Sequence, residues 1–375
     1  MIYLDYNATA KVRPEAVAAM TRALEAGGNP SSVHALGRAA RATVEQARAD
    51  VARLVNVLPG GVTFLSGGTE ANALAIESAA AAGVQRIIVG ATEHDGVIEN
   101  ARATGLPLET WPVDERGIAD LAWLADRLAS GPRSLVCLML ANNETGVIQP
   151  VAEASELVRA AGGWLHVDAV QAAGKIGVDF SALGADTLTL AAHKLGGPQG
   201  VGALAAGPRA TLSRRLHGGG QERGRRAGTE NVPGIAGFGA AAAVALGELP
   251  AMAAQAVWRN ELAAEVKAAG AEVLGERAPR LPQTLCFAIA GFGSELQVMG
   301  LDLAGVMVSA GSACSSGKVK ASRVIEAMGR DDLAPYAIRV SGGWATTAAD
   351  WTACGAAWAE SFARHNARRR APAEV

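Results

Sequence analysis

The chain has 375 residues, of which half are hydrophobic, only 4% are aromatic and 45 are glycine. This length suggests two or three domains, and apolar mass made mostly of Ala, Val and Leu favours helices packed on a sheet. The 34 basic and 36 acidic side chains give a formal net charge of −2. This balance argues against a nucleic-acid-binding protein, which normally has a basic excess, and against a disordered chain.

The four cysteines are widely separated, and none belongs to a Cys-x-x-Cys pair. We therefore expect neither a disulfide framework nor a metal site, and a reducing cytoplasm as the compartment. The N-terminal residues lack the basic region and apolar core of a signal peptide. The longest uncharged run, residues 231–247, is shorter than a membrane span and broken by glycines, so we expect a buried helix and no membrane association.

Helix and strand patterns alternate through the first two thirds of the chain. Residues 35–54 place an apolar stripe among alternating charges, and further helical patterns cover residues 69–82 and 151–161. Short apolar runs predict buried strands at residues 62–65, 86–89, 134–140, 164–167, 187–191 and 201–205. This repetition predicts a mainly parallel sheet with helices on both faces and a site at the carboxyl ends of its strands.

From about residue 251 the pattern changes. A long helical pattern, residues 251–269, leads to a predicted strand at 285–289 and a short apolar run at 306–309. Further helices end in an arginine-rich tail, residues 364–370, which we interpret as a solvated helix end. We interpret this region as a second, smaller α/β domain.

Residues 66–70, Ser-Gly-Gly-Thr-Glu, follow a predicted strand and open a predicted helix. Free N–H groups and the helix dipole make such a turn an anion site, to which Thr69 adds a hydroxyl donor. The alternative is an ordinary glycine turn in which Thr69 is the N-cap, and the segment taken alone favours it.

Two polar residues follow buried strands. Asp168 ends the run at 164–168 and either caps the next helix or meets a cationic ligand. Lys194 comes directly after the strand at 187–191, where desolvation would expose a nucleophilic amine, whereas a lysine snorkelling from a loop is the alternative. An anion cradle, a strand-end carboxylate and a strand-end lysine are together what pyridoxal phosphate requires: phosphate site, partner for the ring nitrogen and Schiff-base amine.

Three other features could carry chemistry. The glycine- and arginine-rich block at 217–229 frames an anionic pocket, forms a subunit contact, or is a flexible surface loop. Arg339 interrupts an apolar, strand-like stretch, and a buried arginine there needs a carboxylate partner, which a substrate could supply. Cys314 lies among small residues, which makes it the best candidate for a reactive thiol, whereas Cys137 and Cys286 fall in apolar runs and are predicted core cysteines.

With these residues assembled, the chain resembles the NifS/IscS-like cysteine desulfurases, within the class V aminotransferase group of fold-type I pyridoxal phosphate enzymes. The likeness runs from Tyr3 to about Thr347. The motifs that carry it lie at residues 28–37 (Gly-Asn-Pro-Ser-Ser-x-His-x-x-Gly), 92–94 (Thr-Glu-His), 142–146 (Asn-Asn-Glu-Thr-Gly), 166–171 (His-Val-Asp-Ala-x-Gln), 193–194 (His-Lys), 217–229 and 311–314 (Gly-Ser-Ala-Cys).

The resemblance implies a two-domain α/β protein. The large domain, residues 12–250, would hold the cofactor on a mainly parallel, seven-stranded sheet covered by helices. The smaller α/β domain would combine residues 1–11 with 251–375 and carry the loop of the catalytic cysteine.

The resemblance also implies a role for each cofactor-binding residue. Lys194 would be the Schiff-base lysine, and Asp168 would pair with the pyridinium nitrogen. His94 would stack on the ring and move protons, and Gln171 would contact the phenolic oxygen. The residues that would hold the phosphate are Gly68, Thr69 and His193, with Thr229 reaching across from the partner subunit of a homodimer.

The implied reaction converts L-cysteine to L-alanine. Asn143 and Arg339 would bind the substrate carboxylate, and the Cys314 thiolate would take up the sulfur as a persulfide. An acceptor protein would then receive the sulfur, for iron–sulfur cluster assembly or other sulfur trafficking. The chain departs from the family at Ala191, where Ser or Thr usually binds phosphate. The alternatives are a related selenocysteine lyase or aminotransferase, and a degenerate paralogue without turnover.

Overall fold

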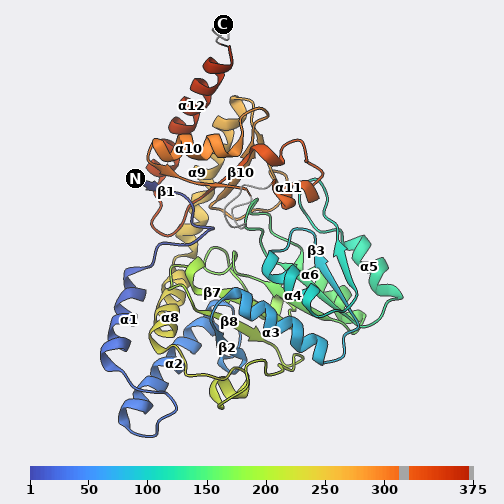
Figure 1. The fold of residues 1–375 in the computed structure, drawn as a ribbon, viewed down its shortest axis with the longest axis vertical. Helices are drawn as coiled ribbons and strands as arrows, with labels where there is room; N and C mark the ends of the chain where they lie inside the picture. The colour runs from blue at the N-terminus through green and yellow to red at the C-terminus, as the bar shows by residue number, and fades with distance from the viewer. Residues whose placement is uncertain (312–320, 371–375) are drawn as a thin grey trace.

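The computed structural model describes residues 1–311 and 321–370 of the chain (Figure 1). A seven-stranded sheet with strand order β2-β8-β7-β6-β5-β3-β4 forms its centre. Among these described strands β8 alone runs in the direction opposite to the other six, which confirms the predicted mainly parallel sheet. The strands are β2 (Val62–Leu65), β3 (Arg86–Gly90), β4 (Leu108–Trp111), β5 (Ser134–Met139), β6 (Trp164–Asp168), β7 (Thr187–Ala191) and β8 (Gly202–Ala206).

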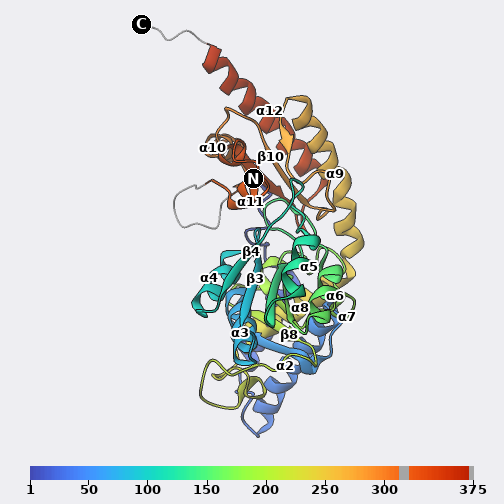
Figure 2. The ribbon, with the colours of Figure 1, turned by 90° about the vertical axis from the view of Figure 1, so that its right-hand side faces the viewer.

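Helices lie on both faces of this sheet, as predicted (Figure 2). One face carries α3 (Gly68–Ala81) and α4 (Asp95–Ala103). The other face carries α5 (Leu121–Ala129), α6 (Val151–Ala160), α7 (Phe180–Leu183) and α8 (Val232–Gly247). Short 3₁₀ turns are η1 (Pro59–Gly61), η2 (Ala192–Lys194), η3 (Gln221–Gly224) and η4 (Ala334–Tyr336).

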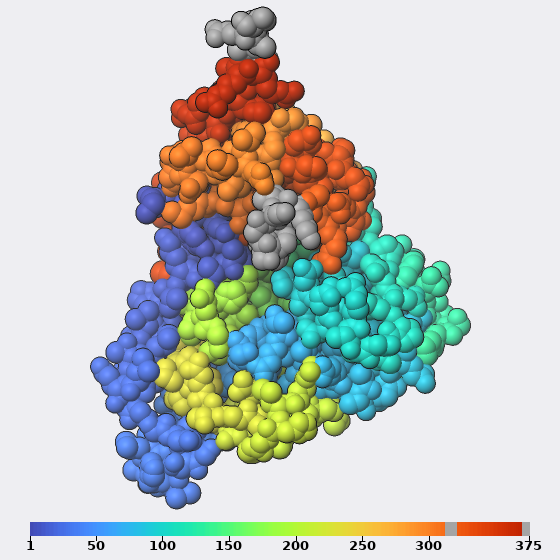
Figure 3. Space-filling view, in the orientation of Figure 1, coloured from blue at the N-terminus to red at the C-terminus, as the bar shows by residue number. Residues whose placement is uncertain are grey.

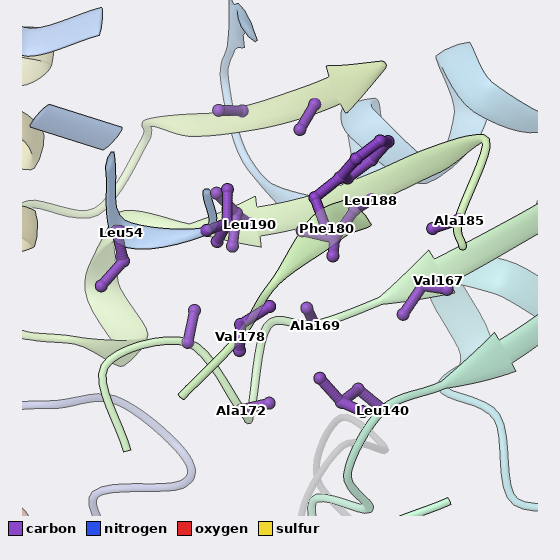
Figure 4. Close-up of a cluster of buried hydrophobic side chains, with 14 of the residues drawn as sticks. Leu54, Leu140, Val167, Ala169, Ala172, Val178, Phe180, Ala185, Leu188 and Leu190 are labelled. Carbon is purple, nitrogen blue, oxygen red and sulfur yellow. The ribbon is translucent and has the colours of Figure 1, made fainter. Parts of the chain in front are cut away.

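The hydrophobic core of the sheet fixes the strands that end at the site (Figure 4). Leu188 and Leu190 point to the same side of β7 because side chains alternate along a strand, and both are fully buried. They pack with Val167 of β6 and with Phe180. Truncating a core leucine of this kind to alanine typically costs about 2–5 kcal/mol. The opposite side of β7 therefore faces α3.

The uncharged run predicted as a buried helix forms α8, which packs against α1 (Pro14–Ala26) and α2 (Ala35–Leu54). Gly239 allows the close approach to α2, since a Cβ there would lie 2.5 Å from the Cα of Ala47. Within the described part of the chain, no single helix is long and apolar enough to cross a bilayer. Taken together, helices α8 and α9 (Leu249–Ala268) have the length and apolar composition of a membrane span, but they meet at a bend of 66°.

A second, antiparallel sheet with the order β12-β13-β10-β9 lies above the first in Figure 1. Its strands are β9 (Glu272–Val273), β10 (Thr284–Ala288), β12 (Ser309–Ala310) and β13 (Ala337–Ser341). The helices of this region are α9, α10 (Ser294–Leu303), α11 (Arg323–Ala327) and α12 (Ala348–Arg370). The predicted core cysteines are confirmed, because Cys137 on β5 and Cys286 on β10 are fully buried.

The N-terminal segment runs between the two sheets. β1 (Ile2–Tyr3) pairs in parallel with β11 (Val306–Met307), so the first residues join the C-terminal region in space. The apolar run at 306–309 contains β11 and the first residue of β12, which belong to different sheets. In Figure 3 the dark blue N-terminal residues adjoin the orange C-terminal region.

Candidate active site

A cavity of ≈ 260 Å³ opens where β6 and β7 end and the N-terminal segment passes. Its lining includes nine of the eleven site residues predicted from the sequence: Gly68, Thr69, His94, Asn143, Asp168, Gln171, His193, Lys194 and Arg339. Thr229 lies elsewhere, and Cys314 lies outside the described residues. Strand ends, a helix N-terminus and the N-terminal segment thus meet at one edge of the sheet, as expected for an open α/β sheet.

The N-terminus of α3 forms one end of the cavity. The N-cap is Gly67, not Thr69, so the alternative in which Thr69 caps the helix is wrong. Gly67 offers no side-chain oxygen, and the first N–H groups of a helix have no intrahelical partner. β8 packs against this turn so closely that position 202 requires glycine, since a Cβ on Gly202 would lie 2.5 Å from the carbonyl carbon of Gly67. The turn can therefore present backbone donors to an anion.

His193 extends this anion site from η2. Burial, together with the nearby Lys194 and Lys175, lowers the pKa of His193 to about 4. The ring is consequently neutral at neutral pH and carries one N–H donor. Its Nδ1 lies 3.2 Å from the hydroxyl oxygen of Thr9, which fixes the ring against the N-terminal segment.

Asp168 is the last residue of β6, and its carboxylate faces the cavity. Oδ1 accepts a hydrogen bond from the backbone N–H of Val170 at 3.0 Å, and Oδ2 accepts one from Asn72 Nδ2 at 3.0 Å. Both bonds stabilise the ionised carboxylate, because a charged acceptor strengthens them. Asp168 therefore offers an anionic oxygen pair of fixed orientation inside the cavity.

A buried chain of hydrogen bonds supports this carboxylate from behind. His166 on β6 lies 3.0 Å from Asn72 Oδ1 through Nε2, and 2.9 Å from Thr187 Oγ1 through Nδ1. Burial lowers the pKa of His166 to about 4, so the ring is neutral. Because Asn72 donates its N–H to Asp168, its oxygen must accept, which places the single ring proton on Nε2 of His166. The sequence reasoning missed Asn72, although it lies three residues after Thr69 and thus on the same side of α3.

Lys194 ends η2, directly after β7, and its amine turns inward. Nζ donates to the carbonyl oxygens of Asn7 at 2.5 Å and Ala8 at 2.8 Å. The side chain is half-buried and lines the cavity, so it does not snorkel from a loop to solvent. Lys194 therefore lines the same cavity as Asp168 and Gln171.

His94 caps α4 through its side chain. Nδ1 accepts the backbone N–H of Gly96 at 2.9 Å, so a neutral His94 ring carries its proton on Nε2. The neighbouring Glu93 is fully buried, and burial followed by repulsion from Asp168 raises its pKa well above the ordinary value. Burial and this repulsion therefore both favour the neutral form of Glu93.

Arg339 enters the cavity from the second sheet, on β13. Its guanidinium is buried, donating through Nη2 to Asp5 Oδ1 at 2.7 Å and through Nη1 to the carbonyl oxygen of Asn143 at 3.0 Å. The prediction that this arginine needs a carboxylate partner is confirmed, with Asp5 in that place. Within the described chain Nε has no hydrogen-bond partner, which leaves a buried donor for a further acceptor.

The sequence and the fold are similar to those of known proteins. The family described as Aminotransferase class-V matches residues 2–353. A cysteine desulfurase of Cereibacter sphaeroides is 43% identical, covering 93% of this chain and 92% of its own length. The chain belongs to the cysteine desulfurase family. Cysteine desulfurase IscS of Dictyoglomus turgidum is 38% identical, covering 93% and 91%.

Solved structures place the chain in the same family. A NifS-like protein from Rickettsia africae superposes with a TM-score of 0.89 at 31% identity, covering 97% of this chain and 99% of its own. A structure described as SspA in complex with cysteine has a TM-score of 0.79 at 25% identity, covering 91% and 98%. Cysteine desulfurases of the class-V aminotransferase family depend on pyridoxal phosphate, and this member does too.

The cavity of this desulfurase fits pyridoxal phosphate on three counts. A Cβ at Gly68 would come within 3.2 Å of Val170 Cγ2, so a side chain would fill the cradle at the helix N-terminus. Asp168 offers a carboxylate to a protonated ring nitrogen, and Lys194 offers an amine to an aldehyde. In the described residues, no group of three His, Cys, Asp or Glu side chains is arranged to hold a metal ion.

The block at 217–229 is anchored and lies apart from this cavity. Glu222 has a left-handed φ of 48° and is buried, where its carboxylate accepts both Nη groups of Arg48 at 2.7 and 2.8 Å. This bidentate pair ties the block to α2, so it is not a freely flexible loop. Thr229 is exposed and lines a different pocket, beside Glu222.

Proposed function

We propose that this desulfurase converts L-cysteine to L-alanine and transfers the sulfur to Cys314 as a persulfide. The observation that supports this most directly is the convergence of Lys194, Asp168 and Arg339 on one cavity. Relatives named cysteine desulfurase, and the SspA structure that holds cysteine, support the same substrate. Cys314 lies outside the described residues, between Ala310 of β12 and Ser322 at the start of α11.

The proposed cofactor site uses both ends of the cavity. Gly68, Thr69 and neutral His193 would hold the phosphate, since all three can donate hydrogen bonds. Asp168 would pair with the ring nitrogen, and Gln171 would contact the phenolic oxygen. When bound, the cofactor supplies an electron sink for the carbanion left when the substrate loses its Cα proton.

Lys194 would bind the cofactor covalently and, once its amine is free, act as the base that removes the Cα proton. The carbonyls of the N-terminal segment keep this amine inside the cavity. His94 would lie against the ring and move protons through Nε2, because Nδ1 is engaged by the helix cap. Asn143 and Arg339 would hold the substrate carboxylate, with the buried Nε of Arg339 as a donor available for it.

The sulfur transfer would be carried out by the thiolate of Cys314. A bond forms between its sulfur and the substrate sulfur while the substrate C–S bond breaks. The electron pair of that bond stays on the substrate carbon, which takes up a proton as alanine forms. No external oxidant is needed, because the two electrons that the sulfurs give up in forming the S–S bond remain with the substrate carbon, which is reduced.

We also propose a homodimer, two domains and a cytoplasmic sulfur acceptor. Thr229 is exposed and outside its own chain's cavity, so it is free to reach the phosphate site of a partner subunit. The domains would be residues 12–250, and residues 1–11 with 251–375, since β1 pairs with β11. The acceptor would take the persulfide sulfur from Cys314 for iron–sulfur cluster assembly or other sulfur trafficking.

Substitution of the proposed nucleophile tests this function. Cys314→Ala should abolish protein-bound persulfide after incubation with L-cysteine, while the cofactor remains bound and visible by absorbance. Cys354→Ala, which removes a buried cysteine on α12, is the matched control and should form persulfide as the unaltered protein does. Undiminished alanine release by Cys314→Ala, with sulfide from L-cysteine or selenide from L-selenocysteine, would instead favour the lyase alternative.

A further inference from the structure

A second lysine, Lys175, is buried next to the cavity without a counter-ion. Its side chain is only 4% exposed, and Nζ donates to Gln171 Oε1 at 2.6 Å and to Asn7 Oδ1 at 3.4 Å. Across the described residues no carboxylate forms an ion pair with this amine, although 21 other ion pairs exist. A buried lysine with neutral partners alone is costly to fold, so its position requires an explanation.

The first consequence concerns Gln171, whose two amide ends have nearly the same shape. A protonated amine can only donate and the backbone carbonyl of Asn7 can only accept, so Oε1 of Gln171 faces Lys175 and Nε2 faces Asn7. One N–H of Nε2 then donates to the carbonyl oxygen of Asn7 at 2.9 Å. Gln171 lines the cavity, and its second N–H remains available there. Lys175 thus makes Gln171 a donor toward the cofactor oxygen.

The second consequence concerns charge. Lys175 and Lys194 line the same small cavity, together with Tyr6 and with Arg13, whose charge is paired with Glu248. Burial, and then repulsion from Lys194 and Arg339, lowers the pKa of Lys175 well below its ordinary value. Repulsion between two ammonium groups acts on both partners, so Lys175 equally disfavours a positive charge on Lys194 as long as it keeps its own proton. The lowered pKa confines this effect to the pH range in which the Lys175 amine is still protonated.

We propose that Lys175 is a positioning residue of the reaction, which orients the Gln171 amide toward the cofactor oxygen and opposes positive charge on Lys194. This inference rests on the proposed roles of Lys194 and Gln171. Both effects act in one direction on a lysine-linked cofactor: they favour loss of the proton shared by the imine nitrogen and the phenolic oxygen. Removing Lys175 should therefore make that proton harder to lose.

The test is a pH titration of the visible absorbance of the cofactor-loaded protein. Lys175→Met should raise the titration midpoint by about half a pH unit or more, while Lys175→Arg, which keeps the donors and the charge, should return it toward that of the unaltered protein. Lys267→Met, at an exposed lysine of α9, is the matched control and should leave the midpoint unchanged. An unshifted midpoint in Lys175→Met would overturn the proposal.

A second variant covers the case in which Lys175→Met does not fold. Lys175→Gln keeps a neutral donor, and it should also raise the midpoint, because the opposing charge is gone. The same unshifted result would overturn the proposal. Failure of the proposed function gives a different result: the absorbance band of the lysine-linked cofactor would then persist in Lys194→Ala. If only this inference fails, that band is present in the unaltered protein and the Lys175 variants have the same titration midpoint as that protein.

Discussion

Substituting Glu144 by glutamine should remove a pH-dependent loss of stability that arises where the two sheets meet. Glu144 lies in the 142–146 motif and is buried, and its Oε2 accepts the hydroxyl of Ser322, the N-cap of α11, at 2.5 Å. A Cβ on Gly311, at the end of β12, would lie 3.3 Å from the same oxygen. The carboxyl group therefore bonds to Ser322 and lies close to Gly311, one on each side of the segment that carries Cys314.

The magnitude follows from the pKa of this carboxyl. Burial raises the pKa of Glu144 from 4.5 to about 7, although Ser322, Arg339 and Arg323 lower it and Asp95 raises it further. The folded protein binds the proton more tightly than the unfolded chain, so the stabilisation is complete below about pH 4.5 and is lost as the pH rises through 7. A difference of roughly 2.5 pH units corresponds to on the order of 3 kcal/mol.

The assay is denaturant unfolding of cofactor-free protein between about pH 5 and pH 8. Glu144→Gln should gain on the order of 2–3 kcal/mol over the unaltered protein across that range, because glutamine has no proton to lose. Glu261→Gln, at an exposed glutamate of α9, should follow the unaltered protein in parallel. Parallel curves for Glu144→Gln as well would refute the reasoning.

Three further substitutions test the cofactor and substrate sites. Asn72→Ala removes a charge-assisted hydrogen bond to Asp168, worth about 1.5–3 kcal/mol, so cofactor affinity measured by fluorescence titration should fall roughly 10- to 100-fold. Asp5→Asn leaves the buried guanidinium of Arg339 without its carboxylate, so unfolding temperature should fall and added L-alanine should raise it more than in the unaltered protein; equal stabilisation contradicts this. Gly202→Ala should displace the turn before α3 and weaken cofactor binding with unchanged far-UV circular dichroism.

The strands were predictable from sequence wherever burial on both faces leaves a continuous apolar run. Residues 62–65 and 187–191 coincide with β2 and β7 for this reason. β4 was missed because it lies at the edge of the sheet, where its Leu-Glu-Thr-Trp sequence is half-exposed and shows no such run. The division of the run at 306–309 between two sheets was not predictable, because a local apolar pattern does not reveal which sheet each residue joins.

The site was predictable to the extent that its residues stand in motifs. The contacts that orient them were not, because they join distant parts of the chain. Lys194 bonds to Ala8, which lies 186 residues earlier, and Asn72 bonds to His166 across 94 residues. Lys175 has an ordinary appearance in sequence, and only the packing of the N-terminal segment shows that it is buried.

We propose that, after Lys194 removes the substrate Cα proton, one sulfur atom is transferred to Cys314 for each alanine released. The measurement that tests it most directly is a single turnover of the cofactor-loaded protein with L-cysteine, in which alanine is quantified and sulfur is located by peptide mass spectrometry. We expect equal amounts of alanine and of persulfide, with the persulfide on the Cys314 peptide. Alanine without sulfur on that peptide, or sulfur on another cysteine, would contradict it.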